Sequence, residues 1–248
     1  MTYKIIFISL LIVMLAVGVS MSRADDTLIT TCDFNTLQTA IQTANEGVIQ
    51  MDCEGTILFP RQISITGDVH LIGNEALILD GGGRTRLFYV ADGASLTIEN
   101  LTIQNGYSTE FGGAMLNDGG SLTIHKVLFT RNRAESGGAI YNGGALTITD
   151  SHFMRNSGEF GGVIYNDEAD TSITNTYFFG NSGVDGAIVY NDKGNTTLIG
   201  IKLLEIWLNY RESAFFNSAN ALMDMRSSDI YGWVLESSAF VNNQGTFL

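Results

Sequence analysis

The chain has 248 residues, with 26 acidic against 13 basic side chains and a formal net charge of −13. Because so large an excess of carboxylates repels nucleic acid and anionic lipid, we expect neither as a partner. The same charge would repel polyuronates such as pectin unless bound cations bridged the two. The length is sufficient for one domain with a continuous hydrophobic core.

Residues 1–24 have the pattern of a secretory signal peptide. Lys4 precedes an uncharged apolar run over 5–19, and the sequence Ser-Arg-Ala, which ends at Ala24, offers small residues where a signal peptidase cuts. A retained membrane anchor is the alternative, but the run is shorter than the roughly 20 apolar residues of a bilayer span. We therefore expect cleavage after Ala24, no transmembrane span in the remaining chain, and a secreted or cell-surface location, the outer membrane included.

Residues 25–56 are expected to cap the fold. Apolar side chains at 34, 37, 41 and 44 have helical spacing, and Asp33 or Asn35 can serve as the N-cap of a short amphipathic helix. Such a helix would cover the open end of the coils that follow, whose edge strands would otherwise be exposed. Both cysteines, Cys32 and Cys53, lie in this segment, and in an exported protein their simplest arrangement is one structural disulfide.

A repeat of about 24 residues organises residues 57–248 and is most regular over 95–198. Three blocks keep this period: Leu-Thr-Ile ending at 98, 124 and 148; Gly-Gly-Ala-Ile and its variants starting at 112, 137, 161 and 185; and Phe-x-x-Asn starting at 129, 153 and 178. Polar and apolar residues alternate as in short strands, and Gly and Asn separate the strands as turn residues. This pattern predicts an all-β solenoid, a right-handed single-stranded parallel β-helix.

Equivalent residues of successive coils should stack into ladders along the axis of the β-helix. We expect the phenylalanines to form an internal stack, and we expect two sets of asparagines to lock turns rather than to bind a ligand. The phenylalanines are Phe129, Phe153 and Phe178, and the asparagine sets are Asn132, Asn156 and Asn181, and Asn117, Asn142 and Asn166.

Over 199–248 the repeat becomes irregular. Ile199, Leu203 and Tyr210 are among apolar residues with helical spacing, so an insertion is expected around 200–211. The sequence Ser-Ala-Phe returns at 213 and 238, which indicates two further, imperfect coils.

The tandem combination of Phe-x-x-Asn with Gly-Gly-Ala-Ile resembles the polymorphic outer membrane protein repeats, which belong to the pectin-lyase-like group of right-handed β-helices. The resemblance covers roughly residues 95–198 and is weaker up to 248. It implies a β-helix displayed as the passenger of an autotransported surface protein, often an adhesin. Its partner would then be a surface protein or glycan of a host or neighbouring cell.

Catalytic and metal-binding constellations cannot be assembled from the sequence. The clustered Asp motifs of inverting hydrolases with this fold are absent, apart from Asp25-Asp26 beside the expected cleavage site, and a lyase needs an Arg or Lys base beside Ca²⁺-binding carboxylates. Arg131 and Arg155 share one phase of the repeat and Glu135 and Glu159 another, which would allow binding of a uronate through Ca²⁺. We favour solvated ion pairs between coils, and expect no cofactor beyond weak Ca²⁺ binding.

The candidate ligand surface consists of three tyrosines, Tyr141, Tyr165 and Tyr190, together with Arg131 and Arg155. Facing outward, the tyrosines would form an aromatic stripe suited to a sugar ring or a partner protein, whereas facing inward they would be core. The repeat leaves their direction open, although Leu116 at the equivalent position favours the core.

Taken together, these features favour an exported, non-catalytic protein with a role in adhesion or other binding over an enzyme. We expect a monomer or part of a longer chain. The alternatives are a polysaccharide lyase or glycoside hydrolase of the pectin-lyase-like fold, and a truncated remnant of a longer surface protein.

Overall fold

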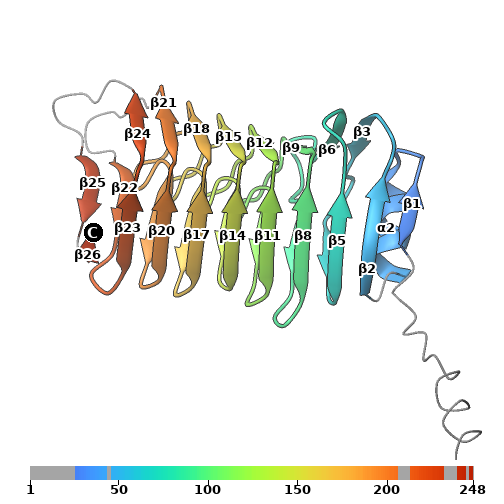
Figure 1. The fold of residues 1–248 in the computed structure, drawn as a ribbon, viewed down its shortest axis with the longest axis horizontal. Coiled ribbons are helices and arrows are strands. Elements are labelled where there is room, and N and C mark those ends of the chain that lie inside the picture. The colour runs from blue at the N-terminus through green and yellow to red at the C-terminus, as the bar shows by residue number, and fades with distance from the viewer. Residues whose placement is uncertain (1–25, 44–45, 206–212, 232–238, 244–245, 248) are drawn as a thin grey trace, which may run out of the picture.

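The computed structural model describes residues 26–43, 46–205, 213–231, 239–243 and 246–247. The expected signal peptide (1–24) lies outside this part of the chain. Within it, the polypeptide winds through three parallel sheets, and each full coil adds one strand to each of them in the order sheet C, sheet A, sheet B. The predicted parallel β-helix is therefore confirmed, and Figure 1 shows its coils stacked side by side along the long axis.

The strands of the three sheets are short and follow one another at the period of the repeat. Sheet A contains β1 (Thr27–Ile29), β2 (Glu46–Met51), β5 (Asp68–Ile72), β8 (Ser95–Glu99), β11 (Ser121–His125), β14 (Ala145–Thr149), β17 (Asp170–Thr174), β20 (Asn195–Ile199), β23 (Leu222–Arg226) and β26 (Thr246–Phe247). Sheet B contains β3 (Gly55–Leu58), β6 (Leu77–Asp80), β9 (Thr102–Gln104), β12 (Leu128–Thr130), β15 (His152–Met154), β18 (Tyr177–Phe179), β21 (Lys202–Leu204) and β24 (Asp229–Tyr231). Sheet C contains β4 (Ile63–Ile65), β7 (Phe88–Val90), β10 (Met115–Asn117), β13 (Ile140–Asn142), β16 (Ile164–Asp167), β19 (Val189–Asp192), β22 (Ser213–Asn217) and β25 (Ala239–Asn243).

Strand alternation places the core inside the coils. In sheet A, Leu122 pairs with Leu96 and Leu146. Ile124 pairs with Ile98 and Ile148 in the same way, so that identical side chains meet along the axis. These leucines and isoleucines are buried, whereas the threonines between them face outward. Each coil thus buries apolar surface mainly against the coils before and after it, which is the source of stability in a solenoid.

In the regular coils, one residue with a left-handed backbone turns the chain from sheet A to sheet B. Asn100, Lys126, Asp150 and Asn175 occupy this corner with φ values of 50–55°. Asn and Asp tolerate that conformation, while Lys126 adopts it at a cost in backbone energy. The corner before sheet C requires glycine: at Gly137, where φ is 67°, an added Cβ would lie 2.2 Å from the carbonyl oxygen of Ile140.

Helix α2 (Phe34–Thr43) covers the first coil at the end where β1 and β2 lie (Figure 1). Its N-cap is Asp33, whose Oδ1 accepts a hydrogen bond of 2.9 Å from the backbone N–H of Thr36. The helix buries Phe34 and Leu37 against the core. A disulfide joins Cys32 to Cys53, as predicted, and so ties this cap to the first coils.

The expected helical insertion after Ile199 is wrong for the residues that the structure describes. β21 continues sheet B, and its Leu203 pairs with Phe178 and is buried, as is Ile201. Ile199, in contrast, ends its strand facing solvent. A strand forms here because pairing with the preceding coil satisfies the backbone hydrogen bonds of β21. The spacing of apolar residues in the sequence does not reveal this pairing. The remainder of the expected insertion, 206–211, lies outside the described residues.

Candidate functional site

The asparagine sets lie inside the coils and bond to one another. In the set that follows sheet B, Asn132 Nδ2 donates to Asn156 Oδ1 at 3.0 Å, and Asn156 Nδ2 donates to Asn181 Oδ1 at 3.1 Å. In the set that ends the strands of sheet C, Asn117 donates in the same way to Asn142, and Asn142 to Asn166. All are at least 97 % buried, so their amides serve the turns and no ligand can reach them.

The phenylalanines of sheet B form an internal stack. The ring centroids of Phe129 and Phe153 are 4.8 Å apart, those of Phe153 and Phe178 are 5.4 Å apart, and the ring planes are nearly parallel. All three side chains are completely buried. They therefore belong to the core and contribute to coil stacking rather than to a surface.

The tyrosines of sheet C stand on the outer face, contrary to the indication from Leu116. The rings of Tyr141, Tyr165 and Tyr190 stack at 5.1 and 4.8 Å, and Phe216 continues the stack at 4.3 Å. Because each ring covers the face of the next, only ring edges and hydroxyls reach solvent. No broad ring face between these tyrosines is free for a sugar ring to stack on.

The hydroxyl groups of this tyrosine stack are also engaged. Tyr141 donates to Asp167 at 2.6 Å, and Tyr165 donates to Asp192 at 3.4 Å. Burial and the neighbouring carboxylates raise the pKa of both phenols, and burial raises that of Tyr190. The stack is therefore best described as a structural ladder on the outside of the β-helix.

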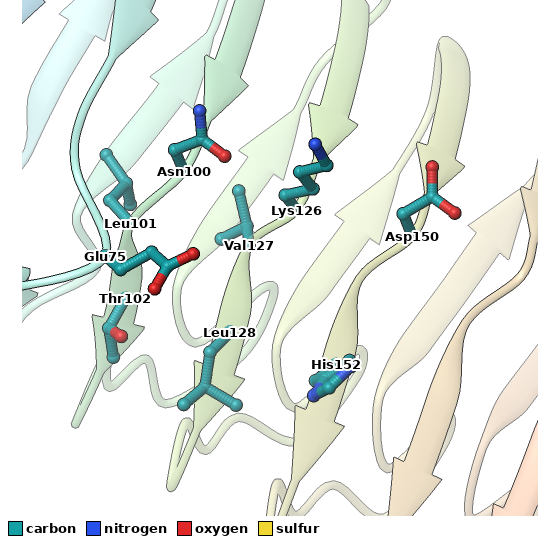
Figure 2. Close-up of a pocket in the computed structure, with 9 residues that line it drawn as sticks. All are labelled: Glu75, Asn100, Leu101, Thr102, Lys126, Val127, Leu128, Asp150 and His152. Atoms are coloured by element: carbon teal, nitrogen blue, oxygen red, sulfur yellow. The ribbon is translucent and has the colours of Figure 1, made fainter.

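A first surface hollow, which we call the corner groove, lies where sheet A turns into sheet B (Figure 2). It has a volume of about 410 Å³ and is lined by Glu75, Asn100, Leu101, Thr102, Lys126, Val127, Leu128, Asp150 and His152. Figure 2 shows Asn100, Lys126 and Asp150 side by side on successive coils, away from His152. No side-chain hydrogen bond joins two of the nine residues, so amine, imidazole and carboxylates do not form a catalytic constellation.

A second hollow, which we call the arginine groove, lies where the chain leaves sheet B. Two adjoining parts of about 520 and 350 Å³ share Tyr107 and Arg133. The larger part also contains Arg131, Asp80 and Asn105, and the smaller part contains Glu135 and Glu159. The groove thus brings Arg131 together with Tyr107 and Arg133, which the sequence did not single out, whereas Arg155 lies one coil beyond Arg131 and does not line it.

The guanidinium groups of Arg131, Arg133 and Arg155 have no ion-pair or side-chain hydrogen-bond partner in the part of the chain that the structure describes. No carboxylate of the described residues lies within ion-pair distance of Arg131, Arg133 or Arg155, so the expected ion pairs with Glu135 and Glu159 do not form. The ion pairs of the described residues are His70–Glu99, His125–Asp150, Lys193–Glu168 and Arg226–Asp224. A shared phase of the repeat places residues in one ladder, but it does not bring side chains of two different ladders within ion-pair distance.

The loop that carries Tyr107 is held firmly. The backbone N–H of Tyr107 donates to the carbonyl of Thr85 at 3.0 Å, and that of Gly106 donates to Asn132 Oδ1 at 2.8 Å. Arg86 braces the other side of the loop, donating to Ser108 and to backbone carbonyls at 111 and 112. Burial lowers the pKa of Arg86, and its hydrogen bonds mark it as a structural residue.

Tyr107 and Arg133 could have been found by looking for exceptions to the repeat. The two residues pair in a bridge between coils, and the same ladder continues as Ser157 and Ser182. The first two residues of this ladder are therefore large and the next two are small. Because small residues are sufficient for the coils to stack at this position, stacking does not explain why Tyr107 and Arg133 are large.

Two other features of the described part of the chain concern metals and membranes. Among its residues, no group of three or more His, Cys, Asp or Glu side chains could hold a metal ion. Its helix lacks the length and the apolar character needed to cross a bilayer.

Comparisons with known proteins agree with this architecture. No curated protein matches the sequence. Among solved structures, a PL6 family alginate lyase, AlyGC, is similar with a TM-score of 0.50 and 12 % identity, over 90 % of this chain and 39 % of that one. The chain thus spans about two fifths of the length of that protein, and the similarity concerns the fold. The model of the family described as right handed beta helix region matches residues 63–203, more than half of the chain, and the protein therefore belongs to the right-handed β-helix family.

Proposed function

We propose that the protein is exported and binds an acidic polysaccharide, without cleaving it, through the arginine groove. The observation that carries the proposal is the set of three exposed arginines without carboxylate partners, Arg131, Arg133 and Arg155. Acidic residues outnumber basic ones two to one in this chain, so unpaired arginines on neighbouring coils are unexpected. Arg131 and Arg133 line the groove, whose lining also includes the carboxylates of Asp80, Glu135 and Glu159.

Like charges in successive coils destabilise a solenoid. Arg131 and Arg155 occupy equivalent positions, about 4.8 Å apart along the backbone ladder, so their guanidinium groups repel each other. An external polyanion would remove this repulsion, and the planar guanidinium group can bind carboxylate or sulfate groups through two hydrogen bonds. A linear acidic polymer that follows the axis would meet arginines at this position in two successive coils, since Asn105 and Gly180 occupy it in the coils before and after.

The proposed setting of this binding is the cell surface. The signal-peptide pattern and the resemblance to surface-displayed repeats support export, and an extended ligand groove is compatible with attachment to glycans of a host or neighbouring cell. A protein partner in place of a glycan would be recognised through the same groove only if it presented a row of acidic groups.

The test is a binding titration with polygalacturonate, alginate and dermatan sulfate. The substitutions are Arg131→Asn and Arg133→Gln, singly and together, and the matched control is Lys126→Asn. Arg131 and Lys126 both have a left-handed backbone, which Asn tolerates, and both carry one unpaired charge. The proposal expects each groove substitution to weaken binding about tenfold, because a charge-assisted hydrogen bond contributes about 1.5 kcal/mol, and expects the control to change it less than twofold.

Salt provides a second measure in the same assay. Raising the ionic strength from low to about 0.5 M should weaken binding to the wild-type protein more than to the double variant, because exposed charges are screened. Equal losses in Arg131→Asn and Lys126→Asn would mean that net charge rather than the groove decides binding, and the proposal would then be wrong.

Cleavage of the same ligand is the second candidate function. The observation in its favour is Asp80, a carboxylate in the groove beside Arg131 and Arg133, since a lyase combines a base with carboxylates. Its oxygens, however, already accept hydrogen bonds from Gln104, Asn105 and Gly82. Elimination would transfer a ring proton to a base, break the glycosidic C–O bond, leave a C=C double bond, and release the leaving oxygen as a hydroxyl once it takes up a proton. A rise in ultraviolet absorbance on mixing with the polymer, with or without Ca²⁺, would therefore show lyase activity and refute binding without cleavage.

A further inference from the structure

We infer that Tyr107 is the platform on which a sugar ring of the ligand stacks in the arginine groove. The inference rests on the proposed function and deepens it, because it names the residue that would distinguish a polysaccharide from other polyanions. It concerns a residue outside the tyrosine stack of sheet C.

The ring of Tyr107 differs from the other outward tyrosines in having no partner. No ring contact, cation–π contact or side-chain hydrogen bond joins it to another described residue, and 37 % of its surface is exposed. In contrast, Tyr141 and Tyr165 are covered by neighbouring rings and donate to aspartates. Tyr107 thus presents an uncovered aromatic ring in a hollow, and such a ring combines an apolar face with a polar hydroxyl tip.

The position of Tyr107 is central to the groove. It lines both parts of the groove, and so does Arg133, with which it pairs in a backbone bridge. Adjacent strands lie about 4.8 Å apart, which is close to the length of one sugar residue along a chain. A ring on Tyr107 would therefore bring its own acidic group, or that of the next sugar, to the guanidinium group of Arg133.

The surroundings leave room for a polymer in both directions. Gly82 and Gly83 form part of the wall, and a Cβ added at Gly83 would meet no atom within 4 Å. Beyond Arg133 the ladder continues with the small residues Ser157 and Ser182. Leu58, which is 61 % exposed, adds an apolar side to the same hollow. A chain of sugar rings that runs along the axis would thus meet an apolar face first and then Arg133, with Glu135 and Glu159 in the same part of the lining.

The test compares acidic polymers with and without rings. The protein and its variants are titrated with polygalacturonate and with linear polyphosphate, which carries charge but no ring. The variants are Tyr107→Ala, Tyr107→Phe and, as a control, Phe111→Ala, which removes an aromatic side chain that is 41 % exposed but outside the groove lining. Thermal unfolding followed by circular dichroism verifies that each variant folds.

The inference predicts a pattern that a merely structural role would not produce. Tyr107→Ala should weaken binding of polygalacturonate about tenfold and leave polyphosphate binding within twofold, whereas Tyr107→Phe and Phe111→Ala should bind both polymers like the wild type. Equal weakening for both polymers, or no weakening, would overturn the role of Tyr107 and leave the arginine groove intact. If the wild-type protein bound neither polymer, the proposed function would fail, and this inference with it.

Discussion

Replacing Asn156 by alanine tests whether the buried amide ladder holds the coils together. Asn156 Oδ1 accepts hydrogen bonds from the backbone N–H and from Nδ2 of Asn132, both at 3.0 Å. Its Nδ2 donates to the carbonyl of Phe129 and to Asn181 Oδ1, both at 3.1 Å. The side chain is completely buried, so water does not replace these contacts in the folded protein.

The expected loss follows from the groups that are left behind. In Asn156→Ala the backbone N–H of Asn132 becomes a buried donor without an acceptor, which costs about 1–3 kcal/mol. Asn132 Nδ2 keeps a second bond to the carbonyl of Ile103, and the carbonyl of Phe129 loses one donor, which adds about 1 kcal/mol. We therefore expect the free energy of unfolding to fall by about 2–4 kcal/mol, measured by guanidinium unfolding followed by circular dichroism.

Asn195→Ala is the matched control for this substitution. Asn195 is exposed on sheet A, and its side chain makes one hydrogen bond, to Asp170. Its loss should change the free energy of unfolding by no more than about 0.5 kcal/mol. Equal effects of the two substitutions would refute the conclusion that the ladder amides stabilise the stacked coils.

Three further outcomes follow from single features of the structure. Reduction of the disulfide should lower the free energy of unfolding by about 3 kcal/mol, the value expected for a sequence separation of 21, measured with and without reductant. In Asp185→Asn, stability should rise at neutral pH and not at pH 3. Burial and then the charge of Glu159 raise the pKa of Asp185, so the wild type loses stability as pH rises through that pKa, and a pH series of thermal unfolding checks this sign. In an alkaline spectrophotometric titration, Tyr141 and Tyr165 should ionise only at pH values well above those of ordinary phenols, and Tyr141→Phe should remove one such group.

The regular coils could be predicted because each ladder is visible in the sequence as a repeated residue. Leu122 and Ile124 recur one period earlier and later, and the strands pair in that register. The spacing from Ile199 to Leu203 led to a wrong prediction of a helix. Apolar side chains four residues apart occur in a helix, but they also occur in two successive strands that are joined by a short turn, as they are here. Strand pairing with the preceding coil decided between them.

The direction of the sheet C tyrosines was harder to predict for a definite physical reason. In β13 the inward side chains are Ile140 and Asn142, and Tyr141 between them faces outward. A polar residue normally marks the outer face, but here the asparagine is buried because the next coil supplies its hydrogen-bond partner. Contacts of this kind depend on what the neighbouring coil supplies. Whether Arg131 has an ion-pair partner depends on the neighbouring coils in the same way, and the sequence did not reveal that it has none among the described residues.

The start of the sheet C ladder offers a graded test of this reasoning. Asn117 lies next to Val90 in the preceding coil, which has no amide, and Asn117 Oδ1 is a buried acceptor without a partner. Asn142, one coil on, accepts from Asn117 Nδ2 at 2.7 Å and donates to Asn166 and to the carbonyl of Gly144. Asn117→Ala removes an unsatisfied acceptor together with its donor bonds, while Asn142→Ala removes a fully bonded amide.

Asn117→Ala should therefore reduce the free energy of unfolding by about 1–2 kcal/mol less than Asn142→Ala, because an unsatisfied buried polar atom costs about that much in the wild type. Both substitutions remove the same atoms from equally buried positions, so the hydrophobic and entropic contributions cancel in the comparison. Equal losses of the free energy of unfolding would mean that a bound water satisfies Asn117 Oδ1. They would also mean that hydrogen bonds between successive amides add no stability to the ladder.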